Sequence, residues 1–300
     1  MKERGTKAVT RRETLALAAA AALARAQSRP LQLGFSLYGM KTVPHLEGLG
    51  HVARIGYKVT ELCLRAGWDT EPKLLTRASR ATIRKRIADL ELTLPSVMEN
   101  MALGRADGQA SNGERLRAAA EVCHECSPGA PALIETTVGG RPANWDSMKS
   151  AMADELGAWA KTAEQLKTTV AIKPHSKTAM NLPERALWLI AQAPSPWIKL
   201  VYDYSHYAAN GLDMKKTMEQ IASRAVFAHI KDVEGPPESF KFLLPGDGHI
   251  DYRAYVAGMK AAGYRGPVVA EVSVDVFDLP GYDPVAAATR VWKNVSPAFG

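Results

Sequence analysis

Ionisable side chains stand at the ends of short apolar runs in the second half of this 300-residue chain. Lys173 ends one run, two residues before His175; Asp203 ends the next, and His229 and Glu271 lie in two more. A buried charge without a partner is costly, so we expect these groups to share one site. Two carboxylates and an imidazole, from Asp203, His229 and Glu271, suit a divalent ion (Mn, Mg, Co, Zn or Fe) and leave positions for substrate oxygens. The sequence therefore predicts a metal site.

Strands must position these side chains. Eight apolar or β-branched runs read as strands: 31–37, 58–63, 94–97, 132–136, 168–173, 199–203, 225–230 and 267–272. Between them, apolar residues recur at helical spacing, as in 46–55, 78–90, 113–122, 148–166, 182–193, 214–222 and 252–262. Strands alternating with helices at this size predict an α/β fold of the (β/α)8 TIM-barrel class. A doubly wound sheet is the alternative, but its G-x-G-x-x-G fingerprint does not follow the first strand.

The barrel prediction also places the site, because active sites of this fold lie at the carboxyl-terminal ends of the strands. A lone Asp or His there is usually a helix cap or a loop hydrogen-bonding residue. Three ligand-type residues on successive strands favour a metal centre instead. Glu61 ends the second strand, and Trp68 follows it with an aromatic face for a sugar ring, with loop packing as the alternative reading.

Five short motifs carry a family resemblance: Gly56-Tyr-x-x-x-Glu61, Asp203-x-x-His206, His229-x-Lys231-Asp232, Gly246-Asp-Gly-His-Ile-Asp251 and Gly266-Pro-x-x-x-Glu271. Together they resemble the xylose-isomerase-like TIM barrels of the sugar phosphate isomerase/epimerase group. That group includes ketose 3-epimerases, inosose dehydratases and isomerases, and endonuclease IV. The resemblance spans roughly residues 31–290 and is most specific from Asp203 onward.

The resemblance implies a metal held by a Glu, an Asp, a His and a Glu, of which the last three fall on Asp203, His229 and Glu271. It also implies that His206 contacts a substrate hydroxyl. The first position departs from the pattern, because Lys173-Pro-His175 stands where the family reads Glu-Pro-His or Glu-Asn-His. In the epimerases two glutamates move protons on opposite faces of the substrate through an enediolate, so the change bears on mechanism.

Three outcomes are open for Lys173. Its ammonium replaces the metal and pairs with Asp203 and Glu271, or a weakened metal persists while Lys173 is displaced and acts as a base, or the site only binds sugar. A divalent cofactor (Mn, Mg, Co or Zn) is thus expected from the ligand set but is open to loss through Lys173.

The sequence favours an isomerase or epimerase that abstracts a proton α to a carbonyl of a carbohydrate or polyol. Glu271 and Lys173 are the predicted catalytic residues. The predicted substrate-binding residues are His206, His175, Lys231, Glu61 and Trp68. A lyase or dehydratase that uses one base is the first alternative, and a non-catalytic periplasmic sugar-binding protein is the second.

The net charge of +7 raises the question of nucleic acid. Residues 1–26 hold six basic and two acidic residues and so contribute +4, which leaves +3 for the remainder. Endonuclease-like chemistry is not favoured either, since the second and third strands end in Glu61-Leu-Cys63 and Val97-Met-Glu99 rather than in histidines. The expected partner is a small carbohydrate and not nucleic acid.

Residues 1–26 resemble a twin-arginine export signal. Arg11-Arg12 precede ten apolar residues, Leu15 to Ala24, and an Ala-Arg-Ala cleavage site. The apolar run is too short for a membrane span. We therefore expect residues 27–300 to form one (β/α)8 catalytic domain in the periplasm or outside the cell, free of the membrane once the signal is cleaved, with a homo-oligomer left open. Cys123 and Cys126 are expected to be incidental helix cysteines, with a local disulfide as the alternative.

Overall fold

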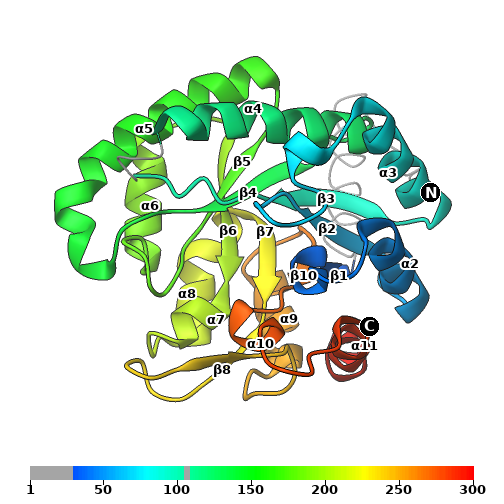
Figure 1. Cartoon of the computed structure of the whole chain (residues 1–300). Helices are drawn as coiled ribbons and strands as arrows, with labels where there is room; N and C mark the ends of the chain where they lie inside the picture. Colours follow the sequence, from blue (N-terminus) through cyan, green and yellow to red (C-terminus); the bar gives the residue numbers. More distant parts are fainter. Residues whose placement is uncertain (1–29, 105–108) are drawn as a thin grey trace, which may run out of the picture. The chain divides into compact units, whose positions relative to one another are not determined.

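Eight parallel strands close into a barrel in the computed structural model of the chain, which describes residues 30–104 and 109–300 (Figure 1). They are β1 (Leu33–Ser36), β2 (Val59–Cys63), β3 (Thr93–Met98), β4 (Leu133–Thr137), β5 (Val170–Lys173), β6 (Ile198–Asp203), β7 (Ala225–Ile230) and β10 (Val268–Ala270). Their order around the barrel is β1-β10-β7-β6-β5-β4-β3-β2, and β1 pairs with both β10 and β2. The predicted (β/α)8 fold is confirmed.

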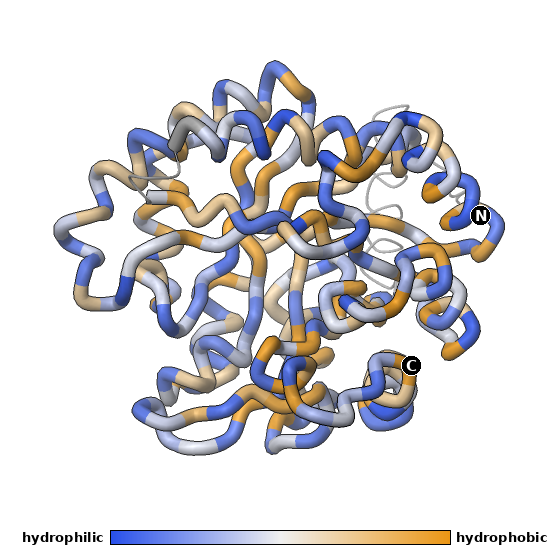
Figure 2. The backbone as a smooth tube through the Cα atoms, in the orientation of Figure 1, coloured by the Kyte–Doolittle hydropathy of each residue, from blue (hydrophilic) through white to orange (hydrophobic). Residues whose placement is uncertain are grey.

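Helices connect the strands on the outside of the barrel. They are α2 (His45–Ile55), α3 (Arg77–Asp89), α4 (Gln109–Cys126), α5 (Trp145–Leu166), α6 (Pro183–Gln192), α7 (Tyr204–Ala208), α8 (Met214–Ile221), α9 (Tyr252–Ala261), α10 (Val274–Phe277) and α11 (Pro284–Val295). Short polar side chains cap the N-termini of several helices. Thr76, Asp213 and Asp251 accept hydrogen bonds from backbone N–H groups in the first turns of α3, α8 and α9. Apolar residues run along the central strands, whereas the surrounding helices alternate between hydrophobic and hydrophilic residues (Figure 2).

The barrel interior is arranged in layers because side chains of a strand alternate between its two faces. One layer is an apolar plug of Val59, Ala171, Val201, Phe227 and Val269, with Leu133 against it. Two residues further along the same strands come charged or imidazole side chains: Glu61, Lys173, Asp203, His229, Glu271 and Glu135. The alternation that fills the barrel therefore also gathers the ionisable groups in the next layer.

A glycine completes the apolar plug on β1. A side chain at Gly34 would place its Cβ 2.8 Å from Val59 and 2.9 Å from Val269. The next inward position on this strand is Ser36, whose hydroxyl reaches the charged layer. The small residue thus lets β1 approach its neighbours closely and bring Ser36 into the site.

The segment that follows β7 contains a two-stranded hairpin. Strands β8 (Asp232–Glu234) and β9 (Lys241–Leu243) pair antiparallel. The Asp232 carboxylate accepts hydrogen bonds from the backbone N–H of Gly246 (2.6 Å) and Ile250 (3.0 Å), and from the Tyr252 hydroxyl (3.2 Å). This one side chain therefore ties the segment that follows the hairpin back to the end of β7.

The predicted export segment, residues 1–26, lies outside the described residues. Leu31–Gly300 forms one compact unit. Within the described ranges, every helix is too short or too polar to span a bilayer. Cys123 and Cys126 are buried in α4 as free thiols, so the local disulfide does not form.

Candidate active site

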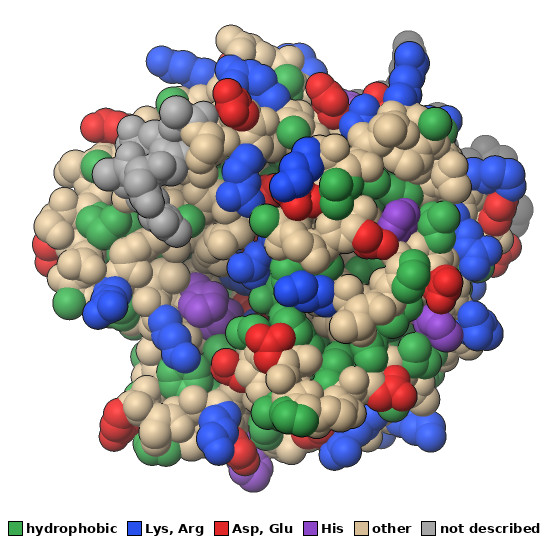
Figure 3. Space-filling model, viewed as in Figure 1, with side chains coloured by type: hydrophobic (Ala, Val, Ile, Leu, Met, Phe, Trp, Pro, Cys, Tyr) green, Lys and Arg blue, Asp and Glu red, His purple; other side chains and the backbone are tan. Residues whose placement is uncertain are grey.

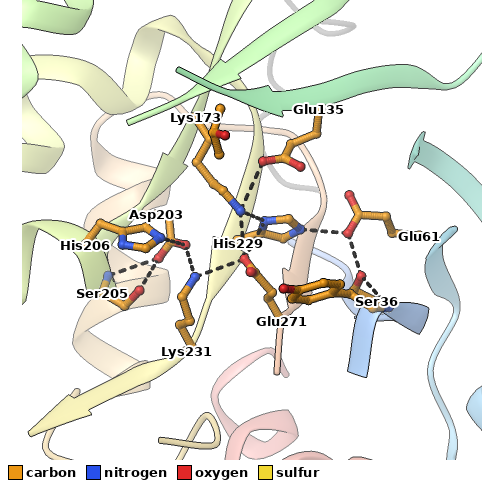
Figure 4. Close-up of polar contacts among 12 residues, drawn as sticks. Ser36, Glu61, Glu135, Lys173, Asp203, Ser205, His206, His229, Lys231 and Glu271 are labelled. Atoms are coloured by element: carbon orange, nitrogen blue, oxygen red, sulfur yellow. Dashed lines mark hydrogen bonds and ion pairs between the residues drawn. The ribbon is translucent and has the colours of Figure 1, made fainter. Parts of the chain in front are cut away.

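A cavity of about 220 Å³ opens where the charged layer meets the loops that follow the strands. Among its lining residues are Glu135, Lys173, His206, Lys231 and Glu271. These side chains come from separate strands and their following turns and point toward one another (Figure 4). On the face shown in Figure 3, basic side chains gather near the middle. The predicted convergence of ionisable groups therefore occurs beside a space that can hold a small molecule.

The Oε2 atom of Glu271 is the meeting point of three nitrogen atoms. It lies 2.8 Å from Lys173 Nζ, 2.9 Å from Lys231 Nζ and 3.0 Å from His229 Nδ1. Burial alone would raise the pKa of Glu271, but the three cationic groups outweigh it and hold the pKa well below its usual range. Glu271 is thus an ionised carboxylate at neutral pH.

Both lysines have a second acidic partner. Lys173 Nζ lies 3.0 Å from Glu135 Oε1, and Lys231 Nζ lies 2.5 Å from Asp203 Oδ2. Burial lowers the pKa of Lys173, but Glu135, Glu271 and Asp203 together raise it above its ordinary value. Lys173 is therefore a fixed cation and not the free amine that a basic role requires.

His229 is held between two carboxylates. Its Nε2 lies 2.9 Å from Glu61 Oε2, and Glu61 in turn accepts hydrogen bonds of 2.6 Å from both Ser36 and Ser96. Burial lowers the pKa of His229, but Glu61 and Glu271 raise it to about 9 against the opposing charge of Lys173. The imidazole is therefore protonated at neutral pH.

His175 and His206 form a neutral imidazole pair at the cavity wall. Their ring centroids are 3.9 Å apart, and His206 Nδ1 lies 3.2 Å from the Ser176 hydroxyl. Burial, then Lys173 and Lys231, lower the pKa of His175 to about 3; burial and His175 hold the pKa of His206 well below its usual range. Both rings line the cavity, so the predicted hydrogen bonds to substrate hydroxyls remain a prediction that their position allows.

Two of the predicted substrate-binding residues, Glu61 and Trp68, do not line the cavity. Glu61 is fully buried beneath the cavity and orients His229. Trp68 packs behind Tyr38, with ring centroids 5.2 Å apart, and donates its indole N–H to the Tyr38 carbonyl. Tyr38 is the aromatic residue of this group that lines the cavity. Trp68 thus supports Tyr38, which lines the cavity, and Glu61 supports His229, which contacts the cavity residue Glu271.

Two carboxyl groups were not assigned a role from the sequence. Glu135 lies in the middle of β4, and burial raises its pKa against the charges of Lys173 and His229. Glu99 lines the cavity mouth, contacts Arg115 and also has its pKa raised by burial. Both stand at strand ends in the sequence, which was the available signal.

Comparison with known proteins agrees with the fold. The sequence profile described as xylose isomerase-like TIM barrel matches residues 49–294. The chain belongs to this family. An L-ribulose-5-phosphate 3-epimerase of Salmonella paratyphi C is 24% identical to it over 263 residues, which is 84% of this chain and 90% of that protein. The relatives of this chain therefore include sugar epimerases.

Solved structures of the family share the architecture. A 3-keto-D-glucoside 4-epimerase from E. coli, in its apo form, has a TM-score of 0.71 at 16% identity and covers 89% of this chain and 99% of its own. The IOLI protein with a bound zinc atom has a TM-score of 0.74 at 18% identity and covers 90% and 100%. At these identities the likeness concerns the fold.

The predicted ligands do come together in this family member. Asp203, His229 and Glu271 each offer one atom, and the three atoms lie within 4.8 Å of one another. Lysine nitrogens contact the same side chains, however, at 2.5 to 3.1 Å. An ion bound 2.0–2.6 Å from Glu271 Oε2 would lie at most about 5.5 Å from both ammonium groups.

The two ammonium groups oppose an ion at such a position. At an effective dielectric constant near 20, a divalent and a unit positive charge about 5.5 Å apart repel by about 6 kcal/mol. His229 also faces a carboxylate with each ring nitrogen, Glu61 on one side and Glu271 on the other, so neither nitrogen is left without a partner for a metal ion. The residues present therefore do not fit a resident divalent metal.

Proposed function

We propose that this chain is a sugar isomerase or epimerase that removes a proton next to a carbonyl group of a carbohydrate and returns one through an enediolate. The observation that carries the proposal is a pair of carboxyl groups at one cavity. Glu271 follows β10 and Glu135 lies on β4, strands that are four places apart in the ring of eight and therefore on opposite sides of the barrel. The sugar-epimerase relatives support the same chemistry.

The surroundings of the two carboxyl groups shift their pKa values in opposite directions. Three cationic neighbours keep Glu271 ionised, whereas burial raises the pKa of Glu135 and favours its protonated form. Two carboxyl groups whose environments separate their pKa values are suited to acid and base roles. We assign Glu271 as the group that takes the proton and Glu135 as the group that gives one from the other side. Glu135 thereby supplies the second carboxyl group, in place of the family glutamate that is Lys173 in this chain.

The cavity wall orients the sugar. Neutral His175 and His206 offer hydrogen-bonding nitrogens to hydroxyl groups. Phe242, on the β8–β9 hairpin, packs edge-on to His206 at 5.0 Å and covers Lys231 Nζ at 5.3 Å. This aromatic cover limits water around the charged groups, which strengthens their effect on a bound carbonyl.

Solvent exchange tests the function. The protein is incubated with ketoses and 3-keto sugars in deuterium oxide and followed by NMR. We expect deuterium at the carbon next to the carbonyl together with an epimer or isomer, and a Glu271→Gln variant without exchange. Lys215→Met, on the exposed face of α8, is the matched control and keeps full activity. Loss of water from the sugar would show a dehydratase instead, and binding without exchange would show a sugar-binding protein; either result refutes the proposal.

Export is a separate proposal that rests on residues 1–26. We propose that the protein is exported already folded and cleaved near Gln27. N-terminal sequencing of the secreted protein should begin near that residue, and an intact Met1 would contradict it.

A further inference from the structure

The positions of Lys173 and Lys231 suggest more than a structural ion-pair network. On the basis of the proposed function, we infer that their two ammonium groups take the place of a divalent metal ion, polarising the carbonyl of an α-hydroxycarbonyl sugar and stabilising its enediolate. Lys231 donates to the substrate oxygen, and Lys173 supplies the second positive charge.

The first argument is the position of the two nitrogens. Both contact one oxygen, Glu271 Oε2, at 2.8 and 2.9 Å, and each is fixed on its other side by a second carboxylate, Glu135 or Asp203. Two unit charges are therefore held at the group assigned as the base. A bound sugar whose proton faces Glu271 has its carbonyl oxygen near the same two charges.

The second argument is access. Both lysines line the cavity although their side chains are only 2–3% exposed. Among the described residues, Lys231 Nζ has two carboxylate acceptors, Asp203 and Glu271, and an ammonium group has three N–H donors. One donor is left for a substrate oxygen. The Phe242 ring over Lys231 Nζ keeps that donor away from bulk water, where its field would be weakened.

The third argument is the arrangement of charge in the cluster. Lys173 contacts Glu135 and Glu271, and Lys231 contacts Asp203 and Glu271. The two ammonium groups thus already lie among the carboxyl groups that a metal ion would need. An ion would have to displace them, whereas an enediolate would bring a negative charge toward the lysines.

The first test measures metal directly and needs no activity. The full chain is incubated with MnCl2, CoCl2 or ZnCl2, dialysed and analysed for metal, and its thermal unfolding is followed with each salt and with EDTA. We expect no stoichiometric metal and an unchanged Tm, because only a ligand that binds the native state raises Tm. Stoichiometric metal, or a Tm that rises with Mn²⁺ and falls with EDTA, overturns the inference.

The second test uses variants. Lys231→Met keeps the length of the side chain and removes the charge, and we expect the rate of deuterium exchange to fall about 100- to 1,000-fold, as for loss of one donor to a developing oxyanion. Lys173→Glu should gain a Mn²⁺-dependent rise in Tm that wild type lacks. An EDTA-insensitive exchange rate that Lys231→Met leaves unchanged would overturn the inference.

The two proposals fail differently. A protein that binds no metal and exchanges no proton from any sugar refutes the isomerase function, while the metal measurements stand by themselves. A protein that exchanges protons only with added metal supports the function and refutes the replacement of metal by lysine.

Discussion

Lys173→Met gives the most direct check of the charge cluster. The substitution keeps most of the buried volume but leaves Glu135 and Glu271 without the ammonium that lies 3.0 and 2.8 Å from them. All three side chains are at most 9% exposed. Removing one partner from a buried ion pair costs about 3–5 kcal/mol, because the remaining charge is uncompensated.

Protonation sets an upper bound on that cost. One carboxyl group with an ordinary pKa of 4.5 can be neutralised for about 5 kcal/mol at pH 8 but for only about 1 kcal/mol at pH 5. In the variant the folded-state pKa is raised, so stability is present below about pH 4.5 and lost as pH rises. In wild type the pKa of Glu271 is lowered, so its contribution is present above that pH. The difference between the two proteins should therefore grow from about 1 kcal/mol at pH 5 to about 3–5 kcal/mol at pH 8.

Urea unfolding at the two pH values measures this difference. Lys215→Met is the control, because that side chain is 84% exposed and its ion pair with Glu219 spans 3.8 Å. It should change the free energy of unfolding by less than about 0.5 kcal/mol at either pH. A loss below about 1 kcal/mol for Lys173→Met at pH 8, or a loss of equal size at both pH values, would refute the assigned pairing.

Three further outcomes are expected elsewhere. Asp232→Ala removes the acceptor of three hydrogen bonds and should destabilise the protein by about 2–4 kcal/mol in urea, with faster hydrogen exchange of the released loop amides; retained protection would contradict this. Phe242→Leu uncovers Lys231 and should raise KM about 3- to 10-fold in the deuterium-exchange assay, whereas an unchanged KM would remove its role in the site. Burial raises the pKa of Glu99, so its contribution to stability is lost as pH rises above about 4.5; Glu99→Gln should therefore gain in stability relative to wild type between pH 5 and 8, and parallel pH curves would argue against it.

Local patterns in the sequence were sufficient to predict the eight barrel strands and most of the layer of ionisable side chains. An ionisable residue two positions after a buried one on the same strand must share its face, so Asp203, His229 and Glu271 were predictable as neighbours. The same rule applies to Glu135, but its place in a predicted strand was its only signal, because no motif surrounds it. Its role became visible only when barrel closure placed β4 beside Lys173.

Long-range contacts account for what the sequence left open. The hairpin strands have three residues each and no apolar periodicity, and the Asp232 contacts that support this region reach 14 to 20 positions along the chain. Trp68 follows a strand end, as a substrate-facing aromatic residue would, but packing against Tyr38 determines its position. The sequence left three outcomes open for Lys173, and the distances to Glu135 and Glu271 are the observations that bear on them.

The charged layer also bears on how the barrel closes. Strands β1 to β4 contribute the acidic side chains Glu61 and Glu135, whereas the cationic groups Lys173, His229 and Lys231 all come from β5 onward. A half-barrel from the first four strands would hold buried negative charge, and one from the remaining strands would lack part of the matching acid. In neither half would every buried charge have its partner, so the ion pairs of the site form only when the barrel closes. Partly opened barrels are thereby disfavoured, and the cavity chemistry itself contributes to cooperative folding.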